Sequence, residues 1–234
     1  MALPGTLTPE MTARQAEMLG NRVKKRFRKQ KKPFERRGIE AFRLYDRDIP
    51  EIRAVVDWYG GHVVIAEYAR TQTDAVADWL AQMADGVRKA LDLPEERVHL
   101  KTRRTRPAEG PRYRRLSKTK RRVAVREGAL SFWVNLNDYI DTGLFLDHRQ
   151  TRAWVGSQAS GGHVLNLYGY TGSFTCYAAA GGARSTTTVD RSATYLEWMK
   201  DNLRLNGLKG RDHRAVQDTA ETFLIDARRG GHVP

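Results

Sequence analysis

The order of apolar and polar positions in the second half of the chain predicts a regular alternation of strands and helices. Residues 164–168 form a short apolar run typical of a buried strand, and the alanine-rich run before Gly181 predicts a helix. Later patterns predict a strand at 185–190, a helix at 193–206, a strand at 213–217 and a helix at 219–229. Strands that alternate with helices indicate an α/β fold with a doubly wound sheet.

The first half of the chain predicts an α+β arrangement. Thr12 is a candidate N-cap of a helix extending to about Arg37, and Pro33 is expected to kink or restart that helix. The pattern predicts strands at 39–45, 54–59, 62–68 and 98–102, a helix at 74–91, and a hairpin formed by 123–125 and 130–136. We therefore expect a disordered tail at 1–10, a basic α+β domain at 11–125 and an α/β domain at 126–234.

A glycine turn separates the strand at 164–168 from the helix that follows it. Gly169 and Gly172 bracket this turn, and Asp190 ends the next predicted strand. Glycine lets the backbone approach a ligand closely, and the acid that ends the second strand of a βαβ nucleotide site accepts hydrogen bonds from ribose hydroxyls. The spacing differs from G-x-G-x-x-G, so it favours S-adenosylmethionine over NAD. The alternative is an ordinary tight turn in which Asp190 caps the next helix.

Positive charge is concentrated in two stretches. The net charge is +14, and residues 22–37 and 101–122 contain ten and eleven Lys or Arg residues, with one Glu in each stretch. Such local basicity is typical of a surface that binds a polyanion. The alternatives are a solvated helix face at 22–37 and a charged linker at 101–122.

The second basic stretch contains two prolines and few apolar residues, which predicts a loop that is mobile without its partner. Tyr113 lies among arginines, and a ring beside guanidinium groups can stack on an unpaired RNA base. The candidate RNA-binding residues are Arg22, Lys24, Lys25, Arg26, Arg28, Lys29, Arg103, Arg104, Arg112, Tyr113, Arg114 and Arg115.

Other residue types restrict the chemistry. Cys176 is the only cysteine, so neither an internal disulfide nor a thiolate metal cage can form, and the six histidines lack ligand spacing. We expect no metal site. No apolar stretch is long enough to span a membrane and the N-terminus lacks an apolar signal core, which predicts a cytoplasmic protein without a membrane partner.

Four motifs, in the right order, resemble the class I methyltransferases of bacterial 23S rRNA, and most of all the RlmK half of the bifunctional RlmKL family. They are DTGLFLDHR at 141–149, NLYGYTGS at 166–173, GGARSTTTVD at 181–190, and YLEW at 195–198 with NLRLNGL at 202–208. Shorter matches precede them, and the resemblance covers about residues 16–230. It implies an N-terminal RNA-binding domain followed by a Rossmann-like methyltransferase domain.

The resemblance also implies a cofactor and an acceptor, namely S-adenosylmethionine and guanine N7 of 23S rRNA. By position, residues of the glycine turn would cradle the methionine part, Asp190 would hold the ribose, and Asp218 is the nearest candidate for an adenine contact, although family members carry their acid at the position of Thr219. The implied cofactor-binding residues are Thr142, Gly143, Asp147, Asn166, Tyr168, Gly169, Tyr170, Thr171, Gly172, Asp190 and Asp218.

Methylation of guanine N7 requires no catalytic acid or base, because N7 already carries a lone pair. The enzyme then contributes alignment of donor and acceptor. Related cytosine-C5 methyltransferases use a cysteine nucleophile, but Cys176 falls within the predicted helix after the glycine turn and is expected to be a small core residue.

The resemblance stops at the end of the chain. Family members continue into a further strand ending Asp-Pro-Pro, so we expect an incomplete sheet with an open edge at residues 164–168. Nothing resembles the RlmL half, which leaves open an RlmL-like partner on a separate chain. Two alternatives to a guanine-N7 methyltransferase therefore remain: a non-catalytic RNA-binding remnant of such an enzyme, and an rRNA methyltransferase with a different acceptor atom.

Overall fold

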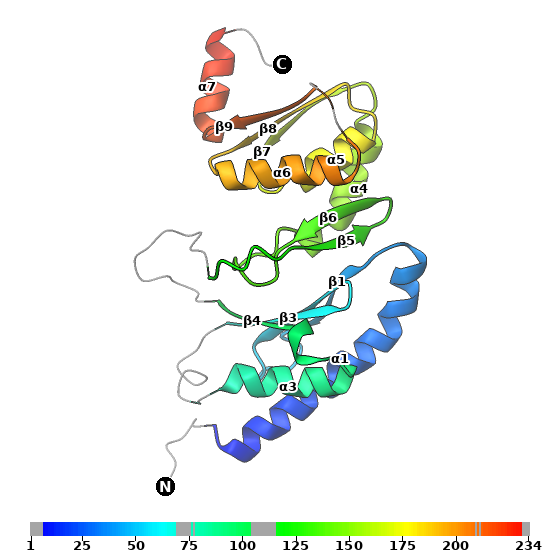
Figure 1. The fold of residues 1–234 in the computed structure, drawn as a ribbon, viewed down its shortest axis with the longest axis vertical. Coiled ribbons are helices and arrows are strands. Elements are labelled where there is room, and N and C mark those ends of the chain that lie inside the picture. The colour runs from blue at the N-terminus through cyan, green and yellow to red at the C-terminus, as the bar shows by residue number, and fades with distance from the viewer. Residues whose placement is uncertain are drawn as a thin grey trace. The chain divides into compact units, whose positions relative to one another are not determined.

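The computed structural model describes residues 7–68, 76, 78–103, 116–208, 210 and 212–230. The chain divides into two compact units (Figure 1). The first contains residues 1–125 and 135–142, and the second contains residues 126–134 and 143–234. Each unit has its own sheet, and each is described below by itself.

The first unit is built on a four-stranded sheet in the order β1-β2-β3-β4. The first three strands are antiparallel neighbours, whereas β3 and β4 are parallel and are joined through a helix. The glycine pair at 60–61 makes the β2–β3 hairpin, as predicted. The elements are α1 (Pro9–Arg36), β1 (Ala41–Asp46), β2 (Ala54–Tyr59), β3 (His62–Tyr68), α3 (Trp79–Leu91), the single turn η1 (Glu95–Arg97) and β4 (Val98–Arg103).

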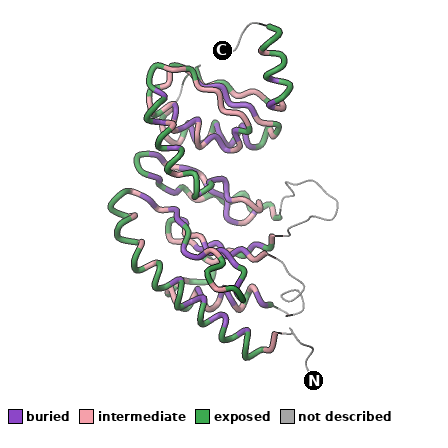
Figure 2. Tube along the Cα trace, turned by 180° about the vertical axis from the view of Figure 1, so that it is seen from behind, coloured by how far each residue is buried: buried purple, intermediate pink, exposed green. Residues whose placement is uncertain are grey.

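Two helices, α1 and α3, supply the apolar side chains that cover this sheet. Leu19 and Val23 of α1 and Met83 and Val87 of α3 are fully buried in one cluster with residues of β1, β2 and β3. Figure 2 shows the same division, with buried positions following one stripe of each helix. The cations of α1 therefore do not prevent packing, because they avoid this stripe.

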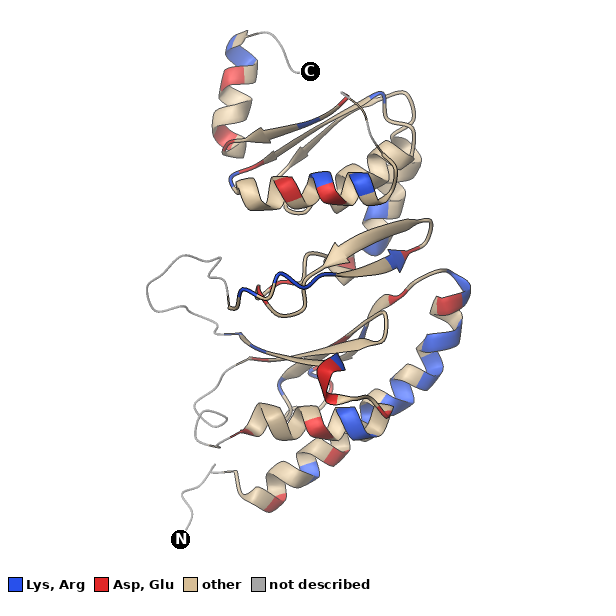
Figure 3. Cartoon of the chain, in the orientation of Figure 1, with Lys and Arg blue, Asp and Glu red and all other residues tan. Residues whose placement is uncertain are grey.

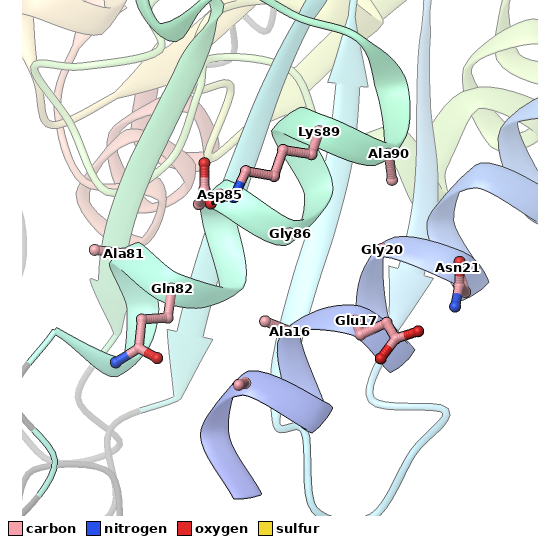
Figure 4. Close-up of a pocket in the computed structure, with 11 residues that line it drawn as sticks. Ala16, Glu17, Gly20, Asn21, Ala81, Gln82, Asp85, Gly86, Lys89 and Ala90 are labelled. Atoms are coloured by element: carbon pink, nitrogen blue, oxygen red, sulfur yellow. Dashed lines mark ion pairs between the residues drawn. The ribbon is translucent and has the colours of Figure 1, made fainter. Parts of the chain in front are cut away.

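The two helices approach each other closely where both carry small residues. A methyl group added to Gly20 would lie 2.6 Å from the carbonyl oxygen of Gly86, and one added to Gly86 would lie 2.4 Å from that of Ala16. Figure 4 shows these positions along the groove between α1 and α3, with Asp85 and Lys89 paired at its rim. Any larger side chain would force the helices apart.

The predicted starts of two helices in the first unit are wrong. The helix α1 begins at Pro9 with Thr8 as its N-cap, so residues 9 and 10 belong to the helix rather than to a disordered tail. The helix continues through Pro33 to Arg36 without restarting, and a kink at Pro33 stays a prediction. The helix α3 begins at Trp79 rather than at 74, since Asp78 has a φ of +62°; residues 69–75 and 77 lie outside the described part.

The second unit contains a parallel sheet in the order β7-β8-β9. The helices α5 and α6 connect these strands and contact each other as well as the sheet. Among the described residues, β7 is an edge strand, and its residues after His163 are partly buried. The elements are η2 (Leu146–His148), α4 (Arg149–Gln158), β7 (His163–Leu167), α5 (Ser173–Ala180), β8 (Ser185–Asp190), α6 (Ala193–Leu205), β9 (His213–Gln217) and α7 (Ala220–Gly230).

A two-stranded hairpin, β5 (Val123–Glu127) and β6 (Leu130–Val134), lies where the chain passes from one unit to the other, and its turn is at the predicted place. Glu127 at the end of β5 forms a buried ion pair with Arg152 of α4, at 2.8 Å and 2.9 Å. Arg152 also donates to the carbonyl of Phe145 at 2.8 Å. No described helix is both long and apolar enough to cross a membrane.

Candidate cofactor site

The turn after β7 has a backbone conformation that few sequences adopt. Tyr168, Tyr170 and Gly172 have φ values of +54°, +50° and +71°. Two tyrosines with positive φ within three residues are unusual, because non-glycine residues avoid the left-handed region. Hydrogen bonds hold the turn, from the Gly169 N–H to the Val189 carbonyl at 3.0 Å and from the Gly172 N–H to the Gly169 carbonyl at 2.9 Å.

Packing requires the two glycines of the turn. A methyl group on Gly169 would lie 2.2 Å from a methyl of Thr188, and one on Gly172 would lie 2.0 Å from Met199. The turn therefore sits directly on β8 and α6. Gly172 is also the N-cap of α5, and it has no side chain to occupy the end of that helix. A helix N-terminus without a side-chain cap presents N–H groups to a polar ligand.

Asp190 joins the turn to the end of β8. One oxygen of its carboxylate accepts a hydrogen bond from the Tyr170 N–H at 2.9 Å, and the other accepts one from the Ser192 N–H at 2.8 Å. Ser192 is itself the N-cap of α6, because its side chain accepts from the Tyr195 N–H. Asp190 is thus more than a helix cap. A carboxylate has about four acceptor positions, and these two bonds leave acceptor capacity for ribose hydroxyls.

A buried asparagine of α6 bonds the backbone of the turn. The Asn202 amide donates to the Thr171 carbonyl at 2.9 Å, and its oxygen accepts from the Trp133 N–H of β6 at 2.9 Å. Asn206, one helical turn later, bonds both backbone groups of Ser131. The sequence analysis did not single out Asn202 as a site residue, although its spacing from Asn206 places both on one helix face.

A chain of polar side chains lies behind the turn. Asn166 donates to the Thr175 hydroxyl at 2.9 Å, and Thr175 shares a hydrogen bond of 2.7 Å with Thr188. Thr175 and Thr188 are buried. These bonds tie β7, α5 and β8 together, so the Asn166 side chain joins the two elements that flank the turn.

The remaining predicted cofactor residues fall in different places. Gly143 accepts a hydrogen bond from the buried Thr171 hydroxyl at 2.5 Å and packs against Trp198. Asp147 in η2 is exposed, with 76% of its side-chain surface accessible. Asp218 follows β9, where its N–H bonds the Asp190 carbonyl at 3.2 Å and its carboxylate accepts from the Thr219 N–H. Thr142 belongs to the first unit, where its hydroxyl bonds Tyr59 at 2.9 Å.

Tyr168 lies at the rim of the site. Its side chain is 66% exposed, and its hydroxyl donates to Glu221 of α7 at 2.7 Å. Together, these contacts place seven predicted residues at the carboxyl ends of β7, β8 and β9. They are Tyr168, Gly169, Tyr170, Thr171, Gly172, Asp190 and Asp218.

The predicted RNA-binding residues divide into described and undescribed positions. Those on α1, from Arg22 to Lys29, are exposed, and Figure 3 shows Lys and Arg gathered along this part of the helix. Arg26 forms an ion pair with Asp48 at 3.1 Å, and Arg103 forms one with Asp141 at 2.9 Å. Arg104, Arg112, Tyr113, Arg114 and Arg115 lie outside the described residues.

Cys176 is the core residue that its position in the sequence suggests. Its side chain is fully buried in α5, and burial raises the pKa of the thiol to about 12. A thiol with this pKa stays protonated and unreactive at neutral pH. Within the described ranges, no three His, Cys, Asp or Glu side chains gather to form a metal site.

Comparison with known proteins supplies the family. The sequence model of the S-adenosylmethionine-dependent methyltransferases matches residues 40–217. The chain belongs to this family. It is 41% identical over 215 residues to the ribosomal RNA large subunit methyltransferase K/L of Aeromonas hydrophila, across 91% of this chain and 30% of that protein. This chain therefore spans about a third of the length of that curated relative.

Solved structures agree with the sequence relationship. A candidate SAM-dependent methyltransferase from Streptococcus mutans superposes with a TM-score of 0.72 and 25% identity, over 92% of this chain and 56% of that one. A candidate methyltransferase complexed with SAH, the demethylated product of the cofactor, gives a TM-score of 0.68 and 26% identity over 91% and 55%. The Rossmann-like fold predicted from the sequence is confirmed.

The residues at the carboxyl ends of these strands suit the family's cofactor. S-adenosylmethionine carries a ribose diol, which needs an acceptor, and an amino acid group, which needs backbone polar groups. Asp190 supplies the carboxylate, and the glycine turn with the uncapped start of α5 supplies N–H groups beside it. The donor and acceptor types of the site therefore match the cofactor.

Proposed function

We propose that this chain is the methyltransferase portion of an enzyme that methylates a base of 23S rRNA, with guanine N7 as the acceptor atom. The observation that carries the proposal is the bond between the Asp190 carboxylate and the Tyr170 N–H, because it joins the ribose-binding acid to the glycine turn. The family supports methyl transfer from S-adenosylmethionine, and the name of the Aeromonas hydrophila relative supports an rRNA substrate.

Each group of residues has a defined task in this proposal. Asp190 binds the ribose, the turn at 168–172 binds the methionine part, Asn202 holds the backbone of the turn, and Asn166 joins β7 to α5 on either side of it. The cofactor supplies an electrophilic methyl group. Guanine N7 attacks it through an existing lone pair, so the protein contributes alignment and exclusion of water rather than proton transfer. The base must leave its stack to reach the donor.

Cofactor binding is tested first by calorimetric titration of the chain with S-adenosylhomocysteine. We expect the wild-type chain to bind, and Asp190→Asn to bind at least 100-fold more weakly, because a lost charge-assisted bond to each hydroxyl costs roughly 1.5–3 kcal/mol. Asp226→Asn is the matched control, since Asp226 lies on the exposed face of α7 and should leave affinity unchanged. Equal affinities of the two variants would remove the ribose-binding role from Asp190.

The acceptor atom is tested with unmethylated 23S rRNA transcribed in vitro. After incubation with the chain and labelled S-adenosylmethionine, borohydride reduction and aniline treatment cleave RNA only at N7-methylated guanine. Cleavage at one labelled nucleotide is the expected result. Label without cleavage would assign a different acceptor atom. Binding of RNA and S-adenosylhomocysteine without any transfer would identify the chain as a binding remnant, or as one that needs an RlmL-like partner half.

A further inference from the structure

Residues 116–122 of the first unit form a loop that is fixed by one buried carboxylate. Asp138 has no solvent-exposed surface, and its side chain accepts five hydrogen bonds. Three come from Ser117 and Thr119, at 2.6 Å, 2.8 Å and 2.8 Å, one comes from the Lys120 N–H at 2.8 Å, and one comes from Asn135 at 3.0 Å. The Asp138 carbonyl accepts a further bond from the Leu116 N–H at 2.7 Å.

The energetics of Asp138 favour the conformation in which the loop surrounds its carboxylate. Burial by itself would raise the pKa of this carboxyl, but the hydrogen bonds from Ser117, Asn135 and Thr119 lower it well below its usual range. A buried carboxylate is tolerated only when such donors surround it. If a donor moved away, the buried carboxylate would lose a hydrogen bond that offsets its desolvation, which is unfavourable. The carboxylate therefore holds the loop in place. Lys120 accepts a left-handed φ of +56° within this arrangement.

The side chains that this loop presents to solvent are cations. Lys118, Lys120, Arg121 and Arg122 are exposed, and the loop contains no acidic residue. Figure 3 shows these positive residues following one another into β5. Within the described part of the chain, Lys118, Lys120 and Arg121 form no ion pair, unlike Arg26 of α1, which is paired with Asp48.

We propose that residues 116–122, held by Asp138, form a preorganised site for the phosphate backbone of RNA. This inference deepens the proposed function, since it rests on an RNA substrate and names the surface that grips it. Three cations on a fixed loop bind phosphates at a lower entropic cost than cations on a mobile one. Because phosphate contacts position RNA without reading its sequence, the loop aligns the substrate and leaves base choice to other residues.

The first test removes the three unpaired cations. The combined variant Lys118→Gln, Lys120→Gln, Arg121→Gln is compared with wild type by fluorescence anisotropy, using a short labelled single-stranded RNA of mixed sequence over a range of KCl concentrations. Three lost phosphate contacts should lower affinity about 100-fold at 0.1 M salt and reduce the slope of log affinity against log salt by about 2.

A matched control keeps the change in net charge the same. The combined variant Lys89→Gln, Lys200→Gln, Arg204→Gln also removes three cations, but each of these is paired with an acid on its own helix, namely Asp85, Glu197 and Asp201. This control should bind RNA within about threefold of wild type, because paired cations release few counterions. Equal weakening of the two variants would overturn the proposal, since net charge alone would then explain binding.

The second test separates preorganisation from charge. Asp138→Asn removes one negative charge and so raises the net charge by one unit. Simple electrostatics therefore predicts tighter RNA binding. The proposal predicts roughly tenfold weaker binding. The new amide NH2 would face the Lys120 N–H or the Asn135 amide, and two donors cannot bond each other, so the loop would lose its anchor. Unchanged or tighter binding by a folded variant contradicts the proposal.

A third variant decides the question if Asp138→Asn does not fold. Ser117→Ala with Thr119→Ala removes two donors without changing charge, and it should also weaken RNA binding. Titration with S-adenosylhomocysteine accompanies every variant and should not change. If wild type binds RNA through the loop but does not bind S-adenosylhomocysteine, the proposed function fails while this inference stands. If it binds S-adenosylhomocysteine and the loop variants bind RNA normally, the inference alone fails.

Discussion

At the scale of single residues, Gly172 combines a left-handed backbone with a contact that leaves no room for a side chain. In Gly172→Ala, the new methyl group would overlap Met199 of α6, and φ would stay at +71°. We expect a loss of about 2–4 kcal/mol in the free energy of unfolding, from strain and overpacking together, and a large loss of affinity for S-adenosylhomocysteine. Urea denaturation and calorimetry measure the two effects.

Gly207 provides the matched control, because it has a similar φ of +68° but nothing within 4 Å of the position of a methyl group. Gly207→Ala should lower the free energy of unfolding by only about 1 kcal/mol, because only the strain of the left-handed backbone contributes. Equal losses in the two variants would show that the contact with α6 does not hold the turn.

Single residues also show how far the sequence predicts the site. Asp190 and the glycine turn were predicted as parts of one cofactor site from the order of strand, turn, helix, strand and acid, and the structure joins them directly. Asn202 and Asp138 were not predicted. The backbone groups that they bind include Lys120 N–H, 18 residues from Asp138, and Trp133 N–H, 69 residues from Asn202, and no local pattern says which buried polar side chain will meet which backbone group.

At the scale of elements, the two histidines on β3 and β4 form a pair that should make stability depend on pH. His62 Nδ1 and His99 Nε2 are 3.1 Å apart, and His99 also bonds Asn137. Burial is the main cause that lowers the pKa of both rings; Arg97 lowers that of His62 further, and for His99 the bond to Asn137 offsets part of the decrease. Both rings are therefore neutral in the folded state at a pH where the unfolded chain would already bind protons.

The sign of the effect follows from this difference. Below about pH 6.5, the unfolded chain binds more protons at these positions than the folded chain does, so stability should fall as pH decreases from 7 to 5. The double variant His62→Asn, His99→Asn should show a smaller decrease when urea denaturation is repeated at each pH. His163→Asn, which alters a histidine paired with Ser185 in the other unit, should behave like wild type. A double variant with an unchanged pH slope would contradict this assignment.

Elements with strong patterns were predicted well, and their ends were not. The strands β2 and β3 have the predicted bounds, because alternation and a glycine turn define both ends. The N-cap of α1 is four residues before the predicted one, and α3 begins five residues after its predicted start. A helix begins where a cap and a backbone angle allow it, and the left-handed Asp78 before α3 has no signature in the sequence.

At the scale of the whole molecule, the cations separate into paired and unpaired sets. On α1, Lys24, Lys25 and Lys29 are exposed, whereas Arg26 is engaged with Asp48. The sequence predicted a basic helix but did not show which cations are already neutralised. The structure therefore selects the three lysines, rather than Arg26, as the groups on α1 that would release counterions when they meet phosphate.

Combining changes on α1 and on the loop at 116–122 tests whether one RNA contacts both. Lys24→Gln, Lys25→Gln, Lys29→Gln should reduce the salt slope by about 2, and adding the three loop substitutions should reduce it by about 4, because each lost phosphate contact removes about 0.7 from the slope for a single strand. Fluorescence anisotropy over a salt series gives both values. If α1 is only a solvated basic face, its variant should keep the wild-type slope, and the combined variant should match the loop variant alone. Additive reductions in the slope would mean that one RNA strand contacts α1 and the loop at 116–122 at the same time.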